Sequence, residues 1–209
     1  ACGLASFAGI CYRLNVVFAT MEKKSFSTSI KFGKYRTFLK NLTEEQKAIV
    51  KSCGFGSLLH FDCTEAPRSV AYLLAKCFDV ATRTVKLQNG SSFELNAFVV
   101  HQVLGVPLGG RRIRDSASKT EKEIIANDTG TSTIALTIEQ LINLVTRDLT
   151  GDKFARIFML ISLAIFLCPT SYGSASKHYY SAIAFVMDIP KYDWCSFILD
   201  WLVDGIVKF

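Results

Sequence analysis

The chain has 209 residues, which is enough for one well-buried domain, since domains usually contain roughly 100 to 200 residues. Half of the residues are hydrophobic and the mean hydropathy is slightly positive, so the composition excludes an intrinsically disordered chain and requires a large core or an apolar interface. The formal net charge of +6 is unevenly placed, and such patches can attract nucleic acid or acidic protein partners.

Residues 1–40 are predicted to form a basic N-terminal arm. Residues 1–20 lack the features of a signal peptide and precede Met21, so they are expected to be a fragment or a gene-model extension. Residues 25–42 are polar, basic and aromatic without a sustained period, which indicates a linker or a loosely docked arm. The arm supplies cations that are candidate contacts for nucleic acid or a protein partner: Lys23, Lys24, Lys31, Lys34 and Arg36.

A helical domain is predicted from residue 41 onward. Thr43 and Gln46 form a capping-box pattern at the start of a short helix. Pro67 in a first helical turn and apolar residues at helical spacing then predict a helix over residues 67–78, and this helix is expected to face the core.

A β-hairpin is predicted over residues 84–95, because two runs alternate polar with apolar residues around the Asn-Gly pair at 89–90. This pair favours positive φ at both turn positions and hence a type I′ turn. Asn96 is a candidate cap for the next helix, which Gly105 ends and Pro107 prevents from continuing.

The loop after Pro107 contains Gly109 and Gly110, followed by three arginines. It lacks the Lys-Ser/Thr ending of a nucleotide-binding loop, so the glycines are better explained by a close or left-handed turn. No structural reason is evident for the arginines. They are therefore the second set of candidate contacts for nucleic acid or a protein partner: Arg111, Arg112 and Arg114.

The second half of the chain is predicted to be helical after a polar insertion. Residues 114–133 are rich in Ser, Thr and charged residues, which indicates an insertion that is mobile at its tip. Helices are expected over residues 137–149, 152–167, 177–187 and from 194 onward. The apolar run at 157–168 is shorter than the roughly 20 residues that span a membrane, so it is expected to be the central buried helix.

The final helix is expected to be capped by Asp193 and to stop inside its apolar pattern at residue 209, which suggests a longer protein. Its predicted buried face consists of Trp194, Phe197, Ile198, Trp201, Leu202 and Ile206. The expected fold is thus mainly α, a compact helical domain at residues 41–209 with one small β-hairpin.

The sequence offers no catalytic set. Seven cysteines, an odd number, are scattered without a Cys-x-x-Cys pair, which indicates free thiols in a reducing compartment such as the cytosol or nucleus. No metal-ligand spacing is present, and no cofactor is expected. A cysteine hydrolase stays open as an alternative, and it requires Cys63 to lie beside His60 or His101.

Several short motifs occur in an order that resembles the plant mobile domain family, also called aminotransferase-like. They lie at 53–59 (Cys-Gly-Phe-Gly-Ser-Leu-Leu), 66–68 (Ala-Pro-Arg), 89–90 (Asn-Gly), 103–110 (Val-Leu-Gly-Val-Pro-Leu-Gly-Gly), 154–159 (Phe-Ala-Arg-Ile-Phe-Met), 166–169 (Phe-Leu-Cys-Pro) and 192–195 (Tyr-Asp-Trp-Cys). The resemblance covers roughly residues 40–209, and the ordered combination carries it rather than any single motif.

The resemblance implies a mainly helical module of transposon origin in a nuclear plant protein. Relatives are tied to transposon silencing and genome maintenance, in some cases with a phosphatase-like partner. It implies no transaminase chemistry and transfers no catalytic residue onto this chain. The first hypothesis is therefore a non-enzymatic interaction domain; a nucleic-acid-binding module and the cysteine hydrolase are the alternatives, and no membrane partner is expected.

Overall fold

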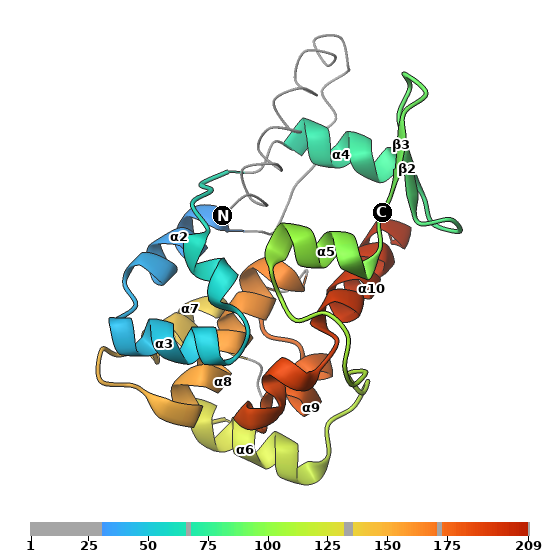
Figure 1. Ribbon diagram of the computed structural model, residues 1–209. Helices are drawn as coiled ribbons and strands as arrows, with labels where there is room; N and C mark the ends of the chain where they lie inside the picture. The colour runs from blue at the N-terminus through green and yellow to red at the C-terminus, as the bar shows by residue number, and fades with distance from the viewer. Residues whose placement is uncertain (1–30, 66–67, 132–135, 171–172, 209) are drawn as a thin grey trace.

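The structure is a computed structural model that describes residues 31–65, 68–131, 136–170 and 173–208, and these are mainly helical (Figure 1). The helices are α2 (Phe32–Lys40), α3 (Glu44–Ser52), η2 (Gly56–His60), α4 (Arg68–Lys76), α5 (Ala97–Leu104), α6 (Lys119–Thr129), α7 (Ile138–Asn143), α8 (Gly151–Ser162), η3 (Leu163–Leu167), η4 (Lys177–Tyr179), α9 (Tyr180–Ile183), η5 (Val186–Lys191) and α10 (Trp194–Val207). The strands are β1 (Phe78–Asp79), β2 (Thr84–Lys86) and β3 (Ser92–Glu94). The predicted mainly α fold is confirmed.

Helix α8 is the centre of the core, as the apolar run after Arg156 predicts. Its last six residues, 157–162, are all buried, and the π-helical turn η3 continues it. Helices α3, α6 and α7 pack against it (Figure 1). The one polar side chain in this run, Ser162, accepts a 2.9 Å hydrogen bond from the hydroxyl of Tyr35. A buried polar atom is thereby satisfied without interrupting the apolar packing. Among the described residues, no helix is long and apolar enough to cross a membrane.

Helix α2 shows that the linker predicted for residues 25–42 is wrong from Phe32 onward. Tyr35, Phe38 and Leu39 follow the i, i+3, i+4 spacing of one helical face, and all three are buried in the main core. Basic residues on the other face mask this apolar stripe in the sequence. The folded unit therefore includes residues that were assigned to the arm.

The capping residues identified in the sequence correctly predicted where helices α3, α5 and α10 begin. Thr43 and Gln46 form the expected capping box at α3. Asn96 accepts a 3.0 Å hydrogen bond from the main-chain N–H of Val99 at the start of α5. Asp193 accepts a 3.1 Å hydrogen bond from that of Ser196 at the start of α10.

The predicted hairpin exists, but it is part of a three-stranded antiparallel sheet in the order β1-β2-β3. The helix expected over 67–78 ends at Lys76, and Phe78 pairs with Val85 in the added strand β1. The type I′ turn is wrong, because of the two turn residues only Gly90 has positive φ. The Gly90 N–H instead donates to Leu87 O at 3.0 Å, so the turn spans residues 87–90, one residue earlier than expected, and Gly90 is its last residue.

The described part of the predicted mobile insertion, residues 114–131, is largely an ordered helix instead. Ser118 and Glu121 make a capping box that begins helix α6, and Ile125 is buried against the core. The helix packs against α8 and α9. Its polar composition hid a single buried stripe. The end of the predicted insertion, residues 132–133, lies outside the described residues.

The C-terminal helices are shorter or rotated relative to expectation. Helix α7 ends at Asn143, and the helix expected over 177–187 is divided into η4, α9 and η5. In α10 the expected buried residue Leu202 is 48% exposed, whereas Leu199 and Val203 are buried in a small second core with Phe78 and Val85. The sheet covers one side of α10, so the buried face is turned toward it.

Candidate functional site

The arginine loop, residues 105–118, is fixed at its start by close backbone approaches. Gly105 ends α5 with φ of +63°, and a Cβ there would lie 2.1 Å from Ser57 Oγ. A Cβ on Gly54, which also has positive φ, would lie 2.8 Å from Pro107 Cγ. The loop therefore packs directly on the segment after α3, and glycine is needed at both contacts.

Main-chain hydrogen bonds join the middle of the loop to the segment between η5 and α10. The Arg111 N–H donates to Lys191 O at 2.8 Å, and the Asp193 N–H donates to Arg111 O at 2.9 Å. The Cys195 N–H donates to Pro107 O at 3.2 Å. The loop is thus bound to this segment as a short strand would be, and its conformation is set by backbone contacts.

Arg111 has a structural role that the sequence did not reveal. Its guanidinium pairs with Asp188 at 2.9 Å and lies over the ring of Tyr192, 4.9 Å from the ring centroid. Lys191 also pairs with Asp188 at 2.9 Å, and hydrogen bonds from Lys191 and then Arg111 lower the pKa of the Asp188 carboxyl. Arg111 is therefore held against η5 rather than being a free contact residue.

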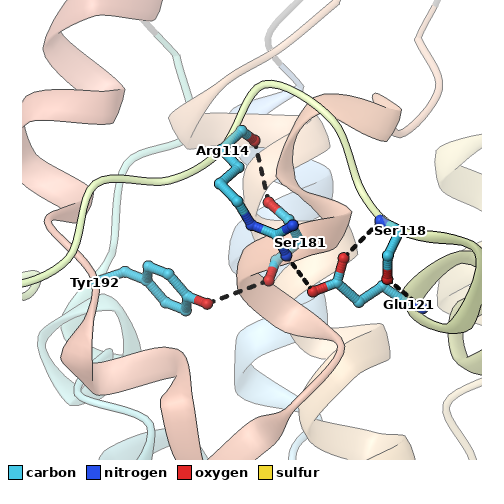
Figure 2. Close-up of polar contacts among 5 residues, drawn as sticks. All are labelled: Arg114, Ser118, Glu121, Ser181 and Tyr192. Atoms are coloured by element: carbon cyan, nitrogen blue, oxygen red, sulfur yellow. Dashed lines mark hydrogen bonds and ion pairs between the residues drawn. The ribbon is translucent and has the colours of Figure 1, made fainter.

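Arg114 is also held by a carboxylate, although its own side chain stays exposed, in the loop that leads into α6 (Figure 2). It pairs with Glu121, whose side chain is only 6% exposed and also accepts a 2.7 Å hydrogen bond from the Ser118 N–H. The Ser181 hydroxyl donates to Arg114 O at 3.1 Å, and the Tyr192 hydroxyl donates to Ser181 O at 3.4 Å. This chain of contacts connects the loop, α9 and the start of α10. Arg114 neutralises a buried carboxylate.

Arg112 is the remaining candidate in the loop. It is exposed, and it makes no ion pair or hydrogen bond with any described residue. In the sequence, Arg112 directly follows Arg111. Met187 directly precedes Asp188, which is the ion-pair partner of Arg111. Met187 is 79% exposed and Phe185 is 49% exposed. We call Arg112, Phe185, Met187 and Lys191 the clamp surface, because all four are exposed and each lies within three positions in the sequence of Arg111 or Asp188, whose ion pair fastens the loop.

The cations of the N-terminal segment do not join this surface. Lys34 pairs with Glu139, and Arg36 pairs with Asp62. Lys31 lies just before α2, and Figure 1 places α2 away from the arginine loop. Lys23 and Lys24 lie outside the described residues. The expected basic patches are therefore two separate sites, in which Lys34, Arg36, Arg111 and Arg114 are neutralised by carboxylates.

No thiol–imidazole pair is present in the described part of the chain. Cys63 is exposed, and it makes no hydrogen bond with His60 or His101. The Nδ1 of His101 lies 2.7 Å from the carbonyl oxygen of Val106, so this nitrogen donates and the imidazole holds the end of α5 against the loop.

The buried thiols are poor nucleophiles. Burial raises the pKa of Cys195 to about 12, and it also raises the pKa values of Cys53 and Cys168. These thiols stay protonated near neutral pH. Across the described ranges there is also no cluster of three or more His, Cys, Asp or Glu side chains placed to hold a metal ion.

The comparisons with known proteins give one match. Residues 28–209 match the model of a family described as a domain of unknown function, DUF8566. No curated protein and no solved structure was found to match the chain. The matched range includes helix α2, in keeping with its burial in the main core.

Proposed function

Since the chain belongs to the DUF8566 family of domains of unknown function, we propose its role from its own residues: a non-enzymatic protein-interaction domain that binds a partner through the clamp surface. In line with the resemblance to plant mobile domains, we place it in a transposon-derived nuclear protein with a role in transposon silencing or genome maintenance. A phosphatase-like protein is the partner class that this resemblance suggests.

The observation that carries the proposal is the exposure of large apolar side chains on a rigid support. The exposed Phe185 directly precedes η5 and the exposed Met187 lies in it, while the unpaired Arg112 follows Arg111, which pairs with Asp188 of η5. Methionine, aromatic residues and arginine are the types enriched at protein interfaces. The underlying loop is fixed by main-chain bonds, so the surface loses little conformational entropy when a partner binds.

The same contacts favour a protein partner over nucleic acid. Nucleic-acid affinity depends on several cations that neutralise phosphates. Arg111 and Arg114 are committed to Asp188 and Glu121, which leaves Arg112 and Lys191 near the exposed Met187. Lys191 itself shares the Asp188 carboxylate. An apolar centre with a cationic rim fits an acidic protein surface better than a phosphate backbone.

Affinity capture from plant nuclear extract tests the proposal. The bait is the 209-residue chain, compared with an Arg112→Glu/Met187→Asp double variant and with a control, Lys153→Glu/Leu202→Asp, at exposed positions outside the clamp surface. Each double variant should lower the free energy of unfolding by no more than about 0.5 kcal/mol per site, because all four residues are exposed. We expect the bait to capture a protein whose recovery falls at least about tenfold with the clamp-surface variant. The control variant should recover the same protein at the level of the unchanged chain.

Nuclease treatment of the extract separates the two kinds of partner. Capture that survives nuclease and depends on the clamp surface supports a protein-interaction domain. Capture that disappears with nuclease, or a set of captured proteins that is the same for both double variants, would contradict the proposal.

A further inference from the structure

A small pocket opens between α6, α7, α8 and the segment around η4, away from the clamp surface residues. Its floor is apolar and includes Ile125, Leu141, Leu160 and Ala175. Its volume is about 50 Å³. Sites for cofactors and other small molecules occupy on the order of 300–1,000 Å³, so this pocket is too small for a nucleotide or similar ligand. It has room for one aliphatic side chain.

The rim of the pocket is cationic. Lys122 on α6 and Lys177 on η4 both line it, both are exposed, and neither forms an ion pair with any residue that the structure describes. The carboxylates of α6 point elsewhere: Glu121 pairs with Arg114, Asp128 pairs with Arg156, and Glu123 lies 3.9 Å from Lys119. None of the described residues that line the pocket is acidic.

Tyr180 adds a neutral donor to the same pocket. Burial raises the pKa of its phenol, so the hydroxyl keeps its proton near neutral pH. The hydroxyl has no hydrogen-bond partner within the described part of the chain. Two ammonium groups and one hydroxyl therefore surround an apolar floor, and all three can donate to carboxylate oxygens.

We propose that this pocket is a docking site for an acidic peptide segment, which inserts one aliphatic side chain between Lys122 and Lys177. The floor removes the side chain from water, and the two lysines pair with carboxylates on either side of it in the peptide. Charge complementarity selects the occupant, because an isolated apolar side chain would gain nothing from the unpaired ammonium groups. The inference goes beyond the proposed function, since none of its residues belongs to the clamp surface.

Fluorescence anisotropy with a labelled peptide tests the pocket. The probe carries one leucine between two pairs of acidic residues, and a matched peptide has serine in place of the leucine. We expect saturable binding of the leucine peptide, at least about tenfold weaker binding of the serine peptide, and a loss of affinity when salt is raised.

Three variants of the chain locate the binding. Lys122→Glu/Lys177→Glu reverses the rim, and Ala126→Leu fills the pocket from α6 while keeping a good helix former. Lys119→Glu/Lys153→Glu is the control, because it changes the net charge equally at exposed lysines that do not line the pocket. The first two should weaken leucine-peptide binding at least about tenfold, and the control should weaken it less than about threefold.

Several results would overturn the docking site. They are the absence of saturable binding, equal losses in the rim variant and its charge-matched control, or unchanged affinity in Ala126→Leu. A Met187→Asp variant should bind the peptide normally. Failure of the docking site is thereby distinguished from failure of the clamp surface, which is tested by capture of a partner.

Discussion

An Asp128→Ala variant is expected to lower the free energy of unfolding by roughly 2 to 3 kcal/mol. The Asp128 carboxylate pairs with Arg156 at 2.5 Å, and the two side chains are only 13% and 12% exposed. Removing Asp128 leaves the mostly buried guanidinium of Arg156 with only the exposed Asp152 as a carboxylate partner, which costs more than the pair itself contributes. Chemical denaturation followed by circular dichroism measures the change.

The control for this prediction is Asp152→Ala. Its carboxylate lies 3.5 Å from the same guanidinium but is 69% exposed, so we expect a loss of at most about 1 kcal/mol. Equal losses in the two variants would show that burial does not set the strength of the Asp128 pair. Arg156 also donates to Ala184 O at 3.2 Å. Ala184 directly precedes Phe185, so this bond helps to hold the segment that carries the clamp surface.

A Gly110→Ala variant is expected to lower the free energy of unfolding by about 2 to 3 kcal/mol, and a Gly109→Ala variant by only about 1 kcal/mol. Both glycines have positive φ, +102° and +76°, so both substitutions introduce backbone strain. Only at Gly110 would the new Cβ meet another atom, Lys191 O at 2.4 Å, which must move for the side chain to fit.

The difference between these two variants isolates the contact between the arginine loop and the segment before α10. Gly110→Ala should disturb the bond from the Arg111 N–H to Lys191 O, which hydrogen exchange of the Arg111 amide detects. Equal stability of the two alanine variants, with unchanged amide protection, would mean that the loop is not held by this approach.

The parts of the fold that the sequence predicted correctly depend on short-range chemistry. The capping box at Thr43, the Asn96 cap and the Gly105 stop each involve residues a few positions apart, so the pattern is complete in the sequence. The apolar run of α8 after Arg156 was recognisable for the same reason, since its burial does not depend on which neighbour covers it.

The errors came from residues whose role depends on distant partners. The polar composition around Glu121 indicated an exposed insertion, yet α6 packs against α8 and α9 and buries Ile125. Leu202 fits the apolar stripe of α10, but the sheet covers the side that carries Leu199 instead. A capping box at Ser118 and Glu121 was the available signal for α6, and it was overlooked.

At the candidate site, too, short-range patterns were predictable from the sequence and long-range contacts were not. Sequence reasoning singled out three arginines after Gly110 as lacking a structural explanation, and the structure explains two of them through Asp188 and Glu121. Nothing local links Arg111 to an aspartate 77 positions away, so the ion pair was not predictable from the sequence. The exposed Met187 was likewise hidden, because residues 177–187 were predicted to form one continuous helix, whereas Met187 lies in the separate turn η5.

Site-specific photocrosslinking tests the central claim most directly. Benzoylphenylalanine replaces Met187 in one form of the chain and Val80, an exposed residue between β1 and β2, in another, and each is irradiated in nuclease-treated plant nuclear extract. The account predicts a discrete protein adduct from position 187 that position 80 does not give and that Arg112→Glu abolishes. Adducts of equal yield from both positions, or none from position 187, would contradict an interaction domain that binds through the clamp surface.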